Sequence, residues 1–156
     1  MSRILAIVGA LLVAGLLVLA LLAPIGPMPG FLIGGEAAEN PAQWPDTSDV
    51  HEILLKVPGT LPRVVIIWVI DHRGELYVLG ASDSGWVKMI GAGSPVQMRL
   101  EGKTYDLHAT PVTQGYESVA AAYMDKYRPD YPEIVGGFPS PEEAAGLISV
   151  FRLNRS

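Results

Sequence analysis

A long uncharged segment near the start of the chain constrains its architecture more than any other feature. Residues 4–23 are twenty consecutive positions occupied by Leu, Val, Ile, Ala and two glycines, with Arg3 before them and Pro24 after them. As an α-helix, at about 1.5 Å per residue, such a segment is about 30 Å long, which matches the hydrocarbon core of a bilayer. Apolar residues occupy its whole circumference, so it lacks the polar face of a helix that lies on a membrane surface. The segment predicts a transmembrane anchor over residues 1–23.

A cleaved secretory signal is the alternative interpretation of this segment. Signal peptides have a shorter apolar region with a small-x-small cleavage site close behind it. Here Leu21 occupies one of those positions and Pro24 follows the cut, so we favour an uncleaved anchor. Arg3 precedes the segment, and no Lys or Arg follows it until Lys56. The positive-inside rule then predicts a single-pass protein of the inner membrane, with a cytoplasmic N-terminus and a periplasmic C-terminal domain; an inward-facing domain is the alternative.

Composition excludes several classes of partner and site. The chain has 11 Lys and Arg residues, 16 Asp and Glu residues and a formal net charge of −5, which argues against nucleic acid as a partner. The predicted anchor makes the lipid bilayer a predicted partner. It has no cysteine, which excludes disulfides, thiolate metal sites and a cysteine nucleophile. The three histidines, His51, His72 and His108, do not have the spacing of a metal site, so we predict none.

Two further regions follow the anchor. Residues 24–50 are rich in proline and glycine and predict a spacer. Trp44 within it has two placements, at the membrane interface or docked on the domain. Residues 51–156 have the length of one small domain.

The first strong strand signal in this domain is a β-branched run over residues 64–70, followed by a second strand over 75–81. Arg73 and Gly74 form the predicted hairpin turn, which places Ile70 opposite Tyr77. The same register places Trp68 opposite Leu79, which makes both faces of the hairpin apolar. A sheet that is apolar on both faces needs two covers. One is a barrel interior, and the other is a helix or a second copy of the chain, so we predict a homodimer.

The remaining pattern completes a mainly β domain. A second hairpin, half-solvated, is predicted over residues 96–112 with its turn at Glu101-Gly102. Short helices are predicted at 85–90 and 116–127, and a third starts at the capping-box pattern that begins with Ser140. Residues 51–57 predict a strand or a short helix, and residues 148–153 a last strand. The predicted fold is α+β, mainly β: one transmembrane helix, then an antiparallel barrel of about six strands with short helices.

Part of this domain is similar to a known superfamily. Residues 74–90, GELYVLGASDSGWVKMI, then 94–100, SPVQMRL, and a hairpin that ends in ATPV at 109–112 carry the likeness. They resemble the split β-barrel superfamily of pyridoxamine 5'-phosphate oxidase-like flavoproteins, and within it the deazaflavin-dependent nitroreductase-like branches. The resemblance covers residues 63–127, with weaker agreement from 131 onward. It implies a split barrel, FMN or a deazaflavin as cofactor, oxidoreductase chemistry, and a dimer with the flavin at the subunit interface.

The cofactor site that follows from this resemblance lies at the start of the helix at 85–90. The backbone N–H groups of Ser84, Gly85 and Trp86, the hydroxyls of Ser82 and Ser84, and the ammonium of Lys88 are the candidate phosphate ligands. Two alternatives stay open: Trp86 plugs the barrel end instead of stacking on a flavin, and Lys88 is simply solvated.

The chain also departs from the pattern of these branches. They carry several basic residues on the short helix, whereas here only Lys88 remains and Ser94 stands where Asn is usual. The short helix therefore has too few basic residues to bind a cofactor with a long polyanionic tail. Two hypotheses follow: a membrane-anchored flavin- or deazaflavin-binding oxidoreductase, and a cofactor-free accessory or binding subunit of a membrane protein complex. The sequence does not decide whether the chain is an enzyme.

Overall fold

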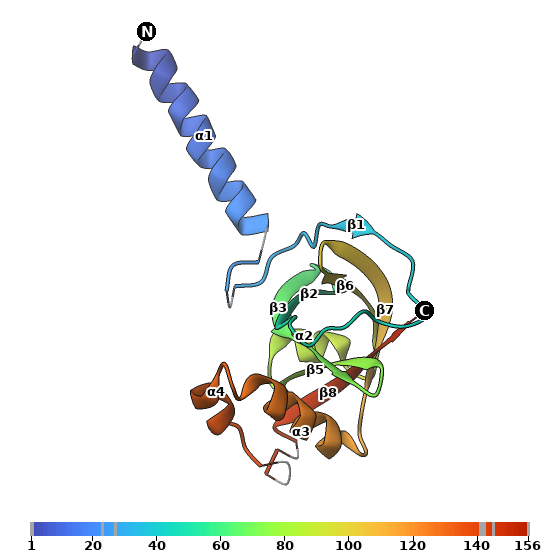
Figure 1. The fold of residues 1–156 in the computed structure, drawn as a ribbon. Helices are drawn as coiled ribbons and strands as arrows, with labels where there is room; N and C mark the ends of the chain where they lie inside the picture. Colours follow the sequence, from blue (N-terminus) through green and yellow to red (C-terminus); the bar gives the residue numbers. More distant parts are fainter. Residues whose placement is uncertain (1, 23, 27, 141–142, 145, 156) are drawn as a thin grey trace.

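One antiparallel sheet curls around the core of the domain (Figure 1). The computed structural model describes residues 2–22, 24–26, 28–140, 143–144 and 146–155, without the side chains at 2, 3, 17 and 19–21. The strand order is β3-β2-β6-β7-β8-β5-β4, and β1 adds in parallel to β7. The strands are β1 (Glu36–Ala37), β2 (Glu52–Val57), β3 (Arg63–Trp68), β4 (Ile70–His72), β5 (Glu75–Ala81), β6 (Ser94–Leu100), β7 (Lys103–Pro111) and β8 (Ile148–Arg155).

The sheet curls into a half-barrel, and its two outer strands are joined at Val69. The outer strands β3 and β4 are consecutive in the chain, and Val69 is the single residue between them. One bent segment therefore pairs with β2 on one side and with β5 on the other. This bend corrects one predicted pairing: Trp68 lies opposite Glu52 of β2, not opposite Leu79. Leu79 lies opposite Val150 of β8, because β4 leaves β5 after three residue pairs.

The two predicted hairpins are confirmed, and their turns explain them. Arg73 and Gly74 have φ of 58° and 81°, and Glu101 and Gly102 have φ of 48° and 83°. Two central residues with positive φ are typical of the type I′ turn, whose twist matches that of the flanking strands. The pairings Ile70–Tyr77 in the first hairpin and Leu100–Lys103 in the second follow from these turns.

Apolar side chains form two clusters, one on each face of the sheet. The inner cluster fills the barrel with fully buried residues such as Leu55, Met98 and Leu153. The outer cluster lies between the sheet and α3 (Tyr116–Tyr127), and it includes Ile70, Val119 and Tyr127. Since α3 covers this outer face, the uncovered apolar face from which we predicted a homodimer is absent from β4 and β5. The homodimer itself stays a prediction.

The helices follow local signals closely. The bounds of α2 (Gly85–Ile90) and α3 agree with the prediction, whereas α4 (Pro132–Gly136) is a helix that was not among those predicted. The capping box at Ser140 is present: the Glu143 carboxylate accepts hydrogen bonds from the Ser140 N–H and hydroxyl. Residues 141, 142 and 145 of the helix predicted there lie outside the described residues, and 143, 144, 146 and 147 form turns.

The segment predicted as a spacer is docked on the barrel along much of its length. Gly30 pairs with Val64 of β3, and Glu36 of β1 pairs with Lys103 of β7. The Trp44 ring is buried and meets the Tyr105 ring edge-on, with centroids 5.2 Å apart. Of the two placements for Trp44, the structure shows the docked one.

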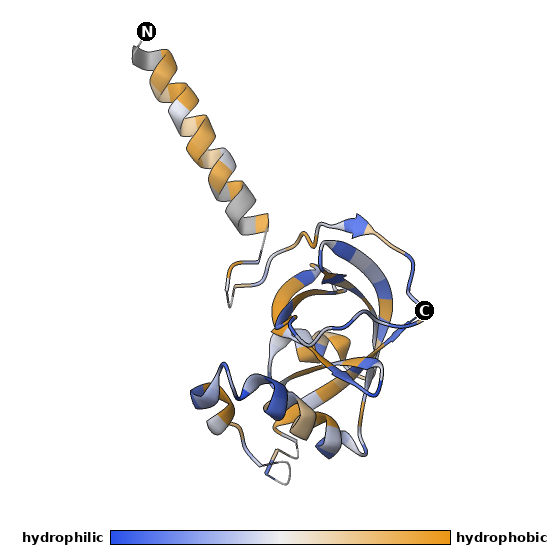
Figure 2. Cartoon of the chain, in the orientation of Figure 1, coloured by the Kyte–Doolittle hydropathy of each residue, from blue (hydrophilic) through white to orange (hydrophobic). Residues whose placement is uncertain are grey.

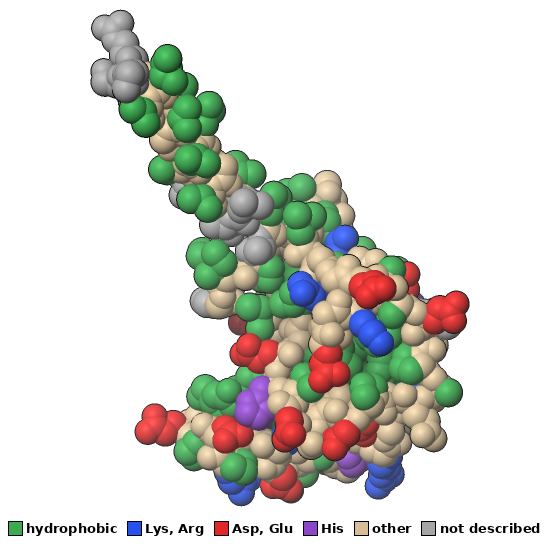
Figure 3. All heavy atoms as spheres, turned by 45° about the horizontal axis from the view of Figure 1, so that its top comes forward, with side chains coloured by type: hydrophobic (Ala, Val, Ile, Leu, Met, Phe, Trp, Pro, Cys, Tyr) green, Lys and Arg blue, Asp and Glu red, His purple; other side chains and the backbone are tan. Residues whose placement is uncertain are grey.

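The N-terminal helix α1 (Ser2–Leu22) projects away from the barrel (Figure 1). The side chains over residues 4–16 are apolar and exposed, with 68% of Ile4, 67% of Leu11 and 66% of Leu16 accessible. Figure 2 shows this helix as mainly hydrophobic, and Figure 3 shows hydrophobic side chains on its surface. Over the residues that the structure describes, no helix combines the length and the hydropathy of a membrane span. The predicted transmembrane anchor is therefore not confirmed by the structure.

Candidate functional site

The start of α2 brings together several groups that can bind an anion. In the described part of the chain, no acceptor contacts the N–H groups of Gly85, Trp86 and Val87, as is normal for the first turn of a helix. The Ser84 hydroxyl is buried and also has no hydrogen-bond partner among the described residues. These groups leave several donors available at one place.

Arg63 adds a positive charge at this place that the sequence analysis missed. A Cβ at Gly85 would collide with the Arg63 guanidinium, so this group lies directly against the Gly85 backbone. Arg63 opens β3 and lies 22 positions before Gly85 in the chain. No local motif links the two, because their contact depends on how β3 and α2 pack together.

The structure gives two of the predicted phosphate donors a partner within the chain, the Ser84 N–H and the Ser82 hydroxyl. The Ser84 N–H donates to the Ala81 carbonyl at 3.0 Å, and the Ser82 N–H donates to the Leu147 carbonyl at 2.9 Å. The Ser82 hydroxyl lies 3.0 Å from the Ser149 hydroxyl. Ser82 is therefore engaged with β8 and its preceding loop, and the prediction that the Ser84 N–H points at an anion is wrong.

Trp86 lies in the barrel core. It is 8% exposed, its ring is 5.9 Å from that of Phe151, and it lies so close to Gly80 that a Cβ there would collide with it. These contacts are those of a packed plug at the barrel end. Lys88 is exposed and lies in the last turn of α2, three residues after Gly85.

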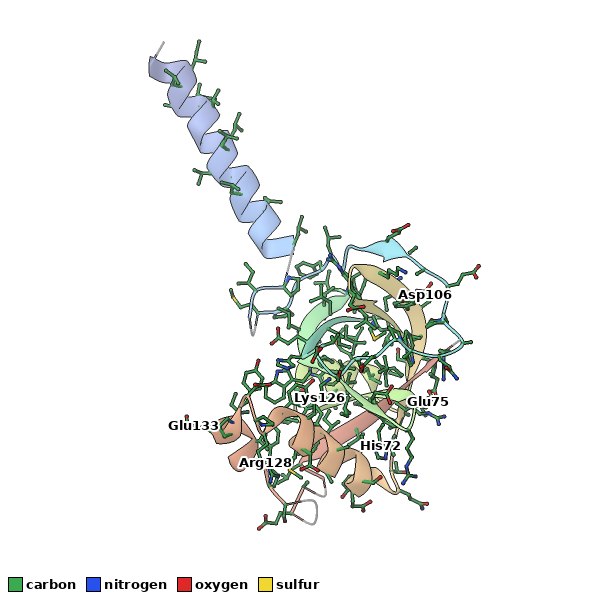
Figure 4. All side chains as sticks on the ribbon, in the orientation of Figure 1. His72, Glu75, Asp106, Lys126, Arg128 and Glu133 are labelled. Carbon is green, nitrogen blue, oxygen red and sulfur yellow. The ribbon has the colours of Figure 1, made fainter. Side chains whose placement is uncertain are left out.

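A second polar centre lies at the Val69 bend, and its role is structural. The bend leaves the Val69 backbone outside the sheet ladder. The Tyr127 hydroxyl accepts from the Val69 N–H at 2.9 Å and lies 2.6 Å from both the Val69 and the His51 carbonyl oxygens. The Lys126 ammonium, which lies where α3 meets the barrel (Figure 4), donates to the carbonyls of Thr47, Val50 and Val69 at 2.7–3.0 Å.

Tyr127 and Lys126 therefore hydrogen-bond to the backbone groups of Val69 at the bend. They also hydrogen-bond to carbonyls of the segment before β2 and hold that segment against the bend. Burial lowers the pKa of Lys126, and the nearby carboxylates of Asp71, Asp46 and Asp49 oppose that shift. Burial raises the pKa of Tyr127 well above its ordinary value, so its hydroxyl keeps its proton. All three ammonium protons of Lys126 have acceptors, which leaves none for a ligand.

The histidines lie apart. His51 Nε2 is 3.3 Å from Asp130 Oδ2, and His72 Nε2 is 3.4 Å from the Ser118 hydroxyl. Among the described residues, no group of three His, Cys, Asp or Glu side chains is placed to hold a metal ion.

Comparison with known proteins places the fold. No known protein family matches the chain, and no curated protein sequence matches it. Among solved structures, the FAD- and heme-binding protein from Mycobacterium smegmatis superposes with a TM-score of 0.51 at 12% identity. The alignment covers 70% of this chain and 62% of that one, so this chain spans less than two thirds of its length. The chain has a split-barrel fold.

Two other solved structures are similar at a lower score. An F420 reductase aligns at a TM-score of 0.48 and 13% identity, over 72% of this chain and 96% of its own. The heme storage protein HutZ from Vibrio cholerae aligns at a TM-score of 0.48 and 14% identity, over 70% of this chain and 84% of its own.

Proposed function

We propose that this chain binds a flavin-type cofactor, FMN or a deazaflavin, through a phosphate group at the start of α2. The observation that carries the proposal is the contact of the Arg63 guanidinium with Gly85, beside N–H groups that have no acceptor among the described residues. A guanidinium and free backbone donors are the groups that bind phosphate oxygens. The name of the Mycobacterium smegmatis protein, which binds FAD and heme, is consistent with such a ligand on this fold.

Each residue at the start of α2 has a distinct part in this proposal. Arg63 supplies the charge, and Gly85 lets both the guanidinium and a phosphate approach the backbone because it has no Cβ. The Ser84 hydroxyl donates once its side chain rotates toward the helix start. Lys88 contributes charge from further away. Arg63 and Lys88 suit one phosphate, so a cofactor with a short anionic group fits better than one with a long polyanionic tail.

The bound cofactor would supply hydride chemistry, and the protein would supply its placement. Trp86 has no contact with the cofactor in this proposal. Its ring is buried in the barrel core and fixes the position of α2. We therefore propose an oxidoreductase-like protein. The alternative, a cofactor-free accessory or binding subunit of a membrane complex, is the conclusion if no flavin binds.

Arg63→Glu is expected to weaken FMN binding at least about tenfold, because a charge-assisted contact is worth roughly 1.5–3 kcal/mol and about 1.4 kcal/mol is tenfold. Gly85→Ala is expected to act in the same direction, since its Cβ displaces the guanidinium. Lys103→Glu makes the same charge change at the exposed tip of the β6–β7 hairpin and is the matched control. Equal affinities for Arg63→Glu and Lys103→Glu, measured by calorimetry on folded protein, would show that the phosphate does not lie at α2.

Lys88→Glu, at the exposed end of α2, is expected to weaken binding less than Arg63→Glu. Its side chain is exposed, so solvent screens its charge, whereas the Arg63 guanidinium lies directly against Gly85. The same calorimetric series gives this ranking.

We also propose that α1 tethers the domain to the inner membrane with the domain on the periplasmic side. The support is the uncharged sequence of residues 4–23 and the exposed apolar side chains of α1, which make no packed contact of the kind seen in the barrel. An exposed apolar surface of this length is unfavourable in water.

Full-length protein is expected to stay with the membrane pellet through washing in alkaline carbonate, because an inserted helix of about 20 apolar residues resists extraction that removes surface-bound proteins. A chain that begins after residue 23 is the control and is expected in the supernatant. Release of the full-length chain by carbonate would contradict the tether.

A further inference from the structure

The uncharged sequence continues beyond α1 into the segment that docks on the barrel. Residues 24–35 consist only of Pro, Ile, Gly, Met, Phe and Leu, so the sequence has no charged side chain between positions 4 and 35. Figure 3 shows hydrophobic side chains where the helix meets the barrel. Four large apolar side chains of this segment are exposed, and we refer to them as the collar: Ile25, Met28, Phe31 and Leu32.

Hydrogen bonds fix the collar at the end of α1. The Leu22 carbonyl, in the last residue of the helix, accepts from the N–H groups of Phe31 and Leu32 at 2.8 and 2.9 Å. Gly30 exchanges two hydrogen bonds with Val64 of β3, at 2.9 and 2.8 Å. The helix therefore joins the barrel through a hydrogen-bonded segment, which places the collar at the base of the helix.

The length of α1 sets the depth of the collar if the helix spans a bilayer. From position 4 to Leu22 the helix rises about 27 Å, at about 1.5 Å per residue. The hydrocarbon core of a bilayer is about 30 Å thick. Since Phe31 and Leu32 bond directly to Leu22, they lie at the level where the hydrocarbon core ends.

The backbone of the collar is suited to an environment with little water. The N–H groups of Ile25 and Met28 each donate to the carbonyl of the other residue, at 3.1 and 3.0 Å. With the two bonds to Leu22, the N–H group of every collar residue has a partner within the chain. A loop in water can bond to solvent instead, whereas backbone groups in contact with lipid need partners in the protein.

We propose that the collar lies in the interfacial layer of the bilayer and holds the barrel against the lipid surface in one orientation. This inference rests on the proposed tether and adds to it a contact between lipid and the segment docked on the barrel. The occupant of the collar is lipid because the collar continues the apolar surface of α1 with no charge between them. Exposed apolar patches of this kind are found where proteins meet membranes.

The test uses single cysteines, because the natural chain has none and each variant carries one label. Met28→Cys and Leu32→Cys place an NBD fluorophore in the collar, at positions where the side chains are 62% and 57% accessible. Ile134→Cys is the matched control. Ile134 is also apolar and exposed, and it belongs to α4, which lies at the end of the barrel away from α1 (Figure 1).

The full-length variants are reconstituted in phosphatidylcholine vesicles that contain a lipid with a nitroxide near the top of its acyl chain. We expect this nitroxide to quench most of the fluorescence at positions 28 and 32 and little of it at position 134. Leu12→Cys, in the middle of α1, reports on the tether separately, with a nitroxide near the end of the acyl chain as its quencher.

A quenched label at position 12 with unquenched labels at 28 and 32 would overturn the collar proposal and leave the tether intact. Unquenched labels at all of these positions would overturn both. Blue-shifted emission from positions 28 and 32 without quenching by lipid would show that protein, such as a second copy of the chain, covers the collar, and would also overturn the proposal.

Discussion

Trp86→Ala is expected to lower the free energy of unfolding by about 3–5 kcal/mol, the usual cost of removing a large buried aromatic side chain. Trp86 is 8% exposed and packs against Phe151 and over Gly80, so its removal opens a cavity at the end of the barrel. Urea denaturation of the folded chain measures this loss. A loss below about 1 kcal/mol, together with weaker flavin binding, would contradict the plug and favour stacking on the cofactor.

A double-mutant cycle with Gly80→Ala is the control for this contact. In the wild-type background, the added methyl group collides with the Trp86 ring, and we expect a loss of about 1–3 kcal/mol from overpacking. In the Trp86→Ala background, the collision is gone and the substitution is expected to be close to neutral. Equal effects in both backgrounds would show that the two residues do not interact.

Lys126→Met is expected to destabilise the protein by about 3 kcal/mol, because it leaves three carbonyl oxygens without their charged donor. Those carbonyls belong to Thr47, Val50 and Val69, so the substitution releases the segment before β2 and the bend together. The loss is smaller than the sum of three charged hydrogen bonds, because burial of the ammonium is itself unfavourable.

The matched control for Lys126→Met is Lys103→Met. Lys103 is exposed at the start of β7, and this substitution is expected to change stability by less than about 0.5 kcal/mol. Limited proteolysis of Lys126→Met should also show faster cleavage near residues 45–50. Stability equal to that of Lys103→Met would contradict the role of Lys126 as the link between α3 and the bend.

Local signals predicted much of this fold. Glycines that favour positive φ and the residues that flank a helix lie within a few positions of the element they end, so the turns at Arg73-Gly74 and Glu101-Gly102 and the bounds of α2 and α3 could be predicted, although neither helix has a side-chain cap hydrogen bond. The alternation of apolar residues in β6 and β7 likewise predicted which face is buried.

The features that sequence reasoning missed all depend on contacts between distant segments. The bend at Val69 lies inside an unbroken apolar run and is stabilised by side chains of α3, 57 and 58 positions later. The docking of Trp44 on Tyr105 is equally non-local. A proline- and glycine-rich composition indicates that a segment lacks regular structure, not that it lacks tertiary contacts.

The candidate site shows the same limit. The sequence indicated α2 and its N–H groups, because they are adjacent in the chain. It did not indicate Arg63, which reaches Gly85 through the packing of β3. It also did not show that the Ser84 N–H is occupied by Ala81, since that bond depends on the conformation of the turn.

The most direct test of the proposed function is calorimetric titration of the full-length protein with FMN and, separately, with a deazaflavin. We expect saturable binding of one cofactor per chain with a Kd of micromolar order, which corresponds to about −8 kcal/mol. A yellow or deazaflavin absorbance that stays with the protein on gel filtration would accompany it. Absence of binding of both cofactors at about 100 μM, well above that Kd, would contradict the flavin proposal and leave the accessory-subunit hypothesis.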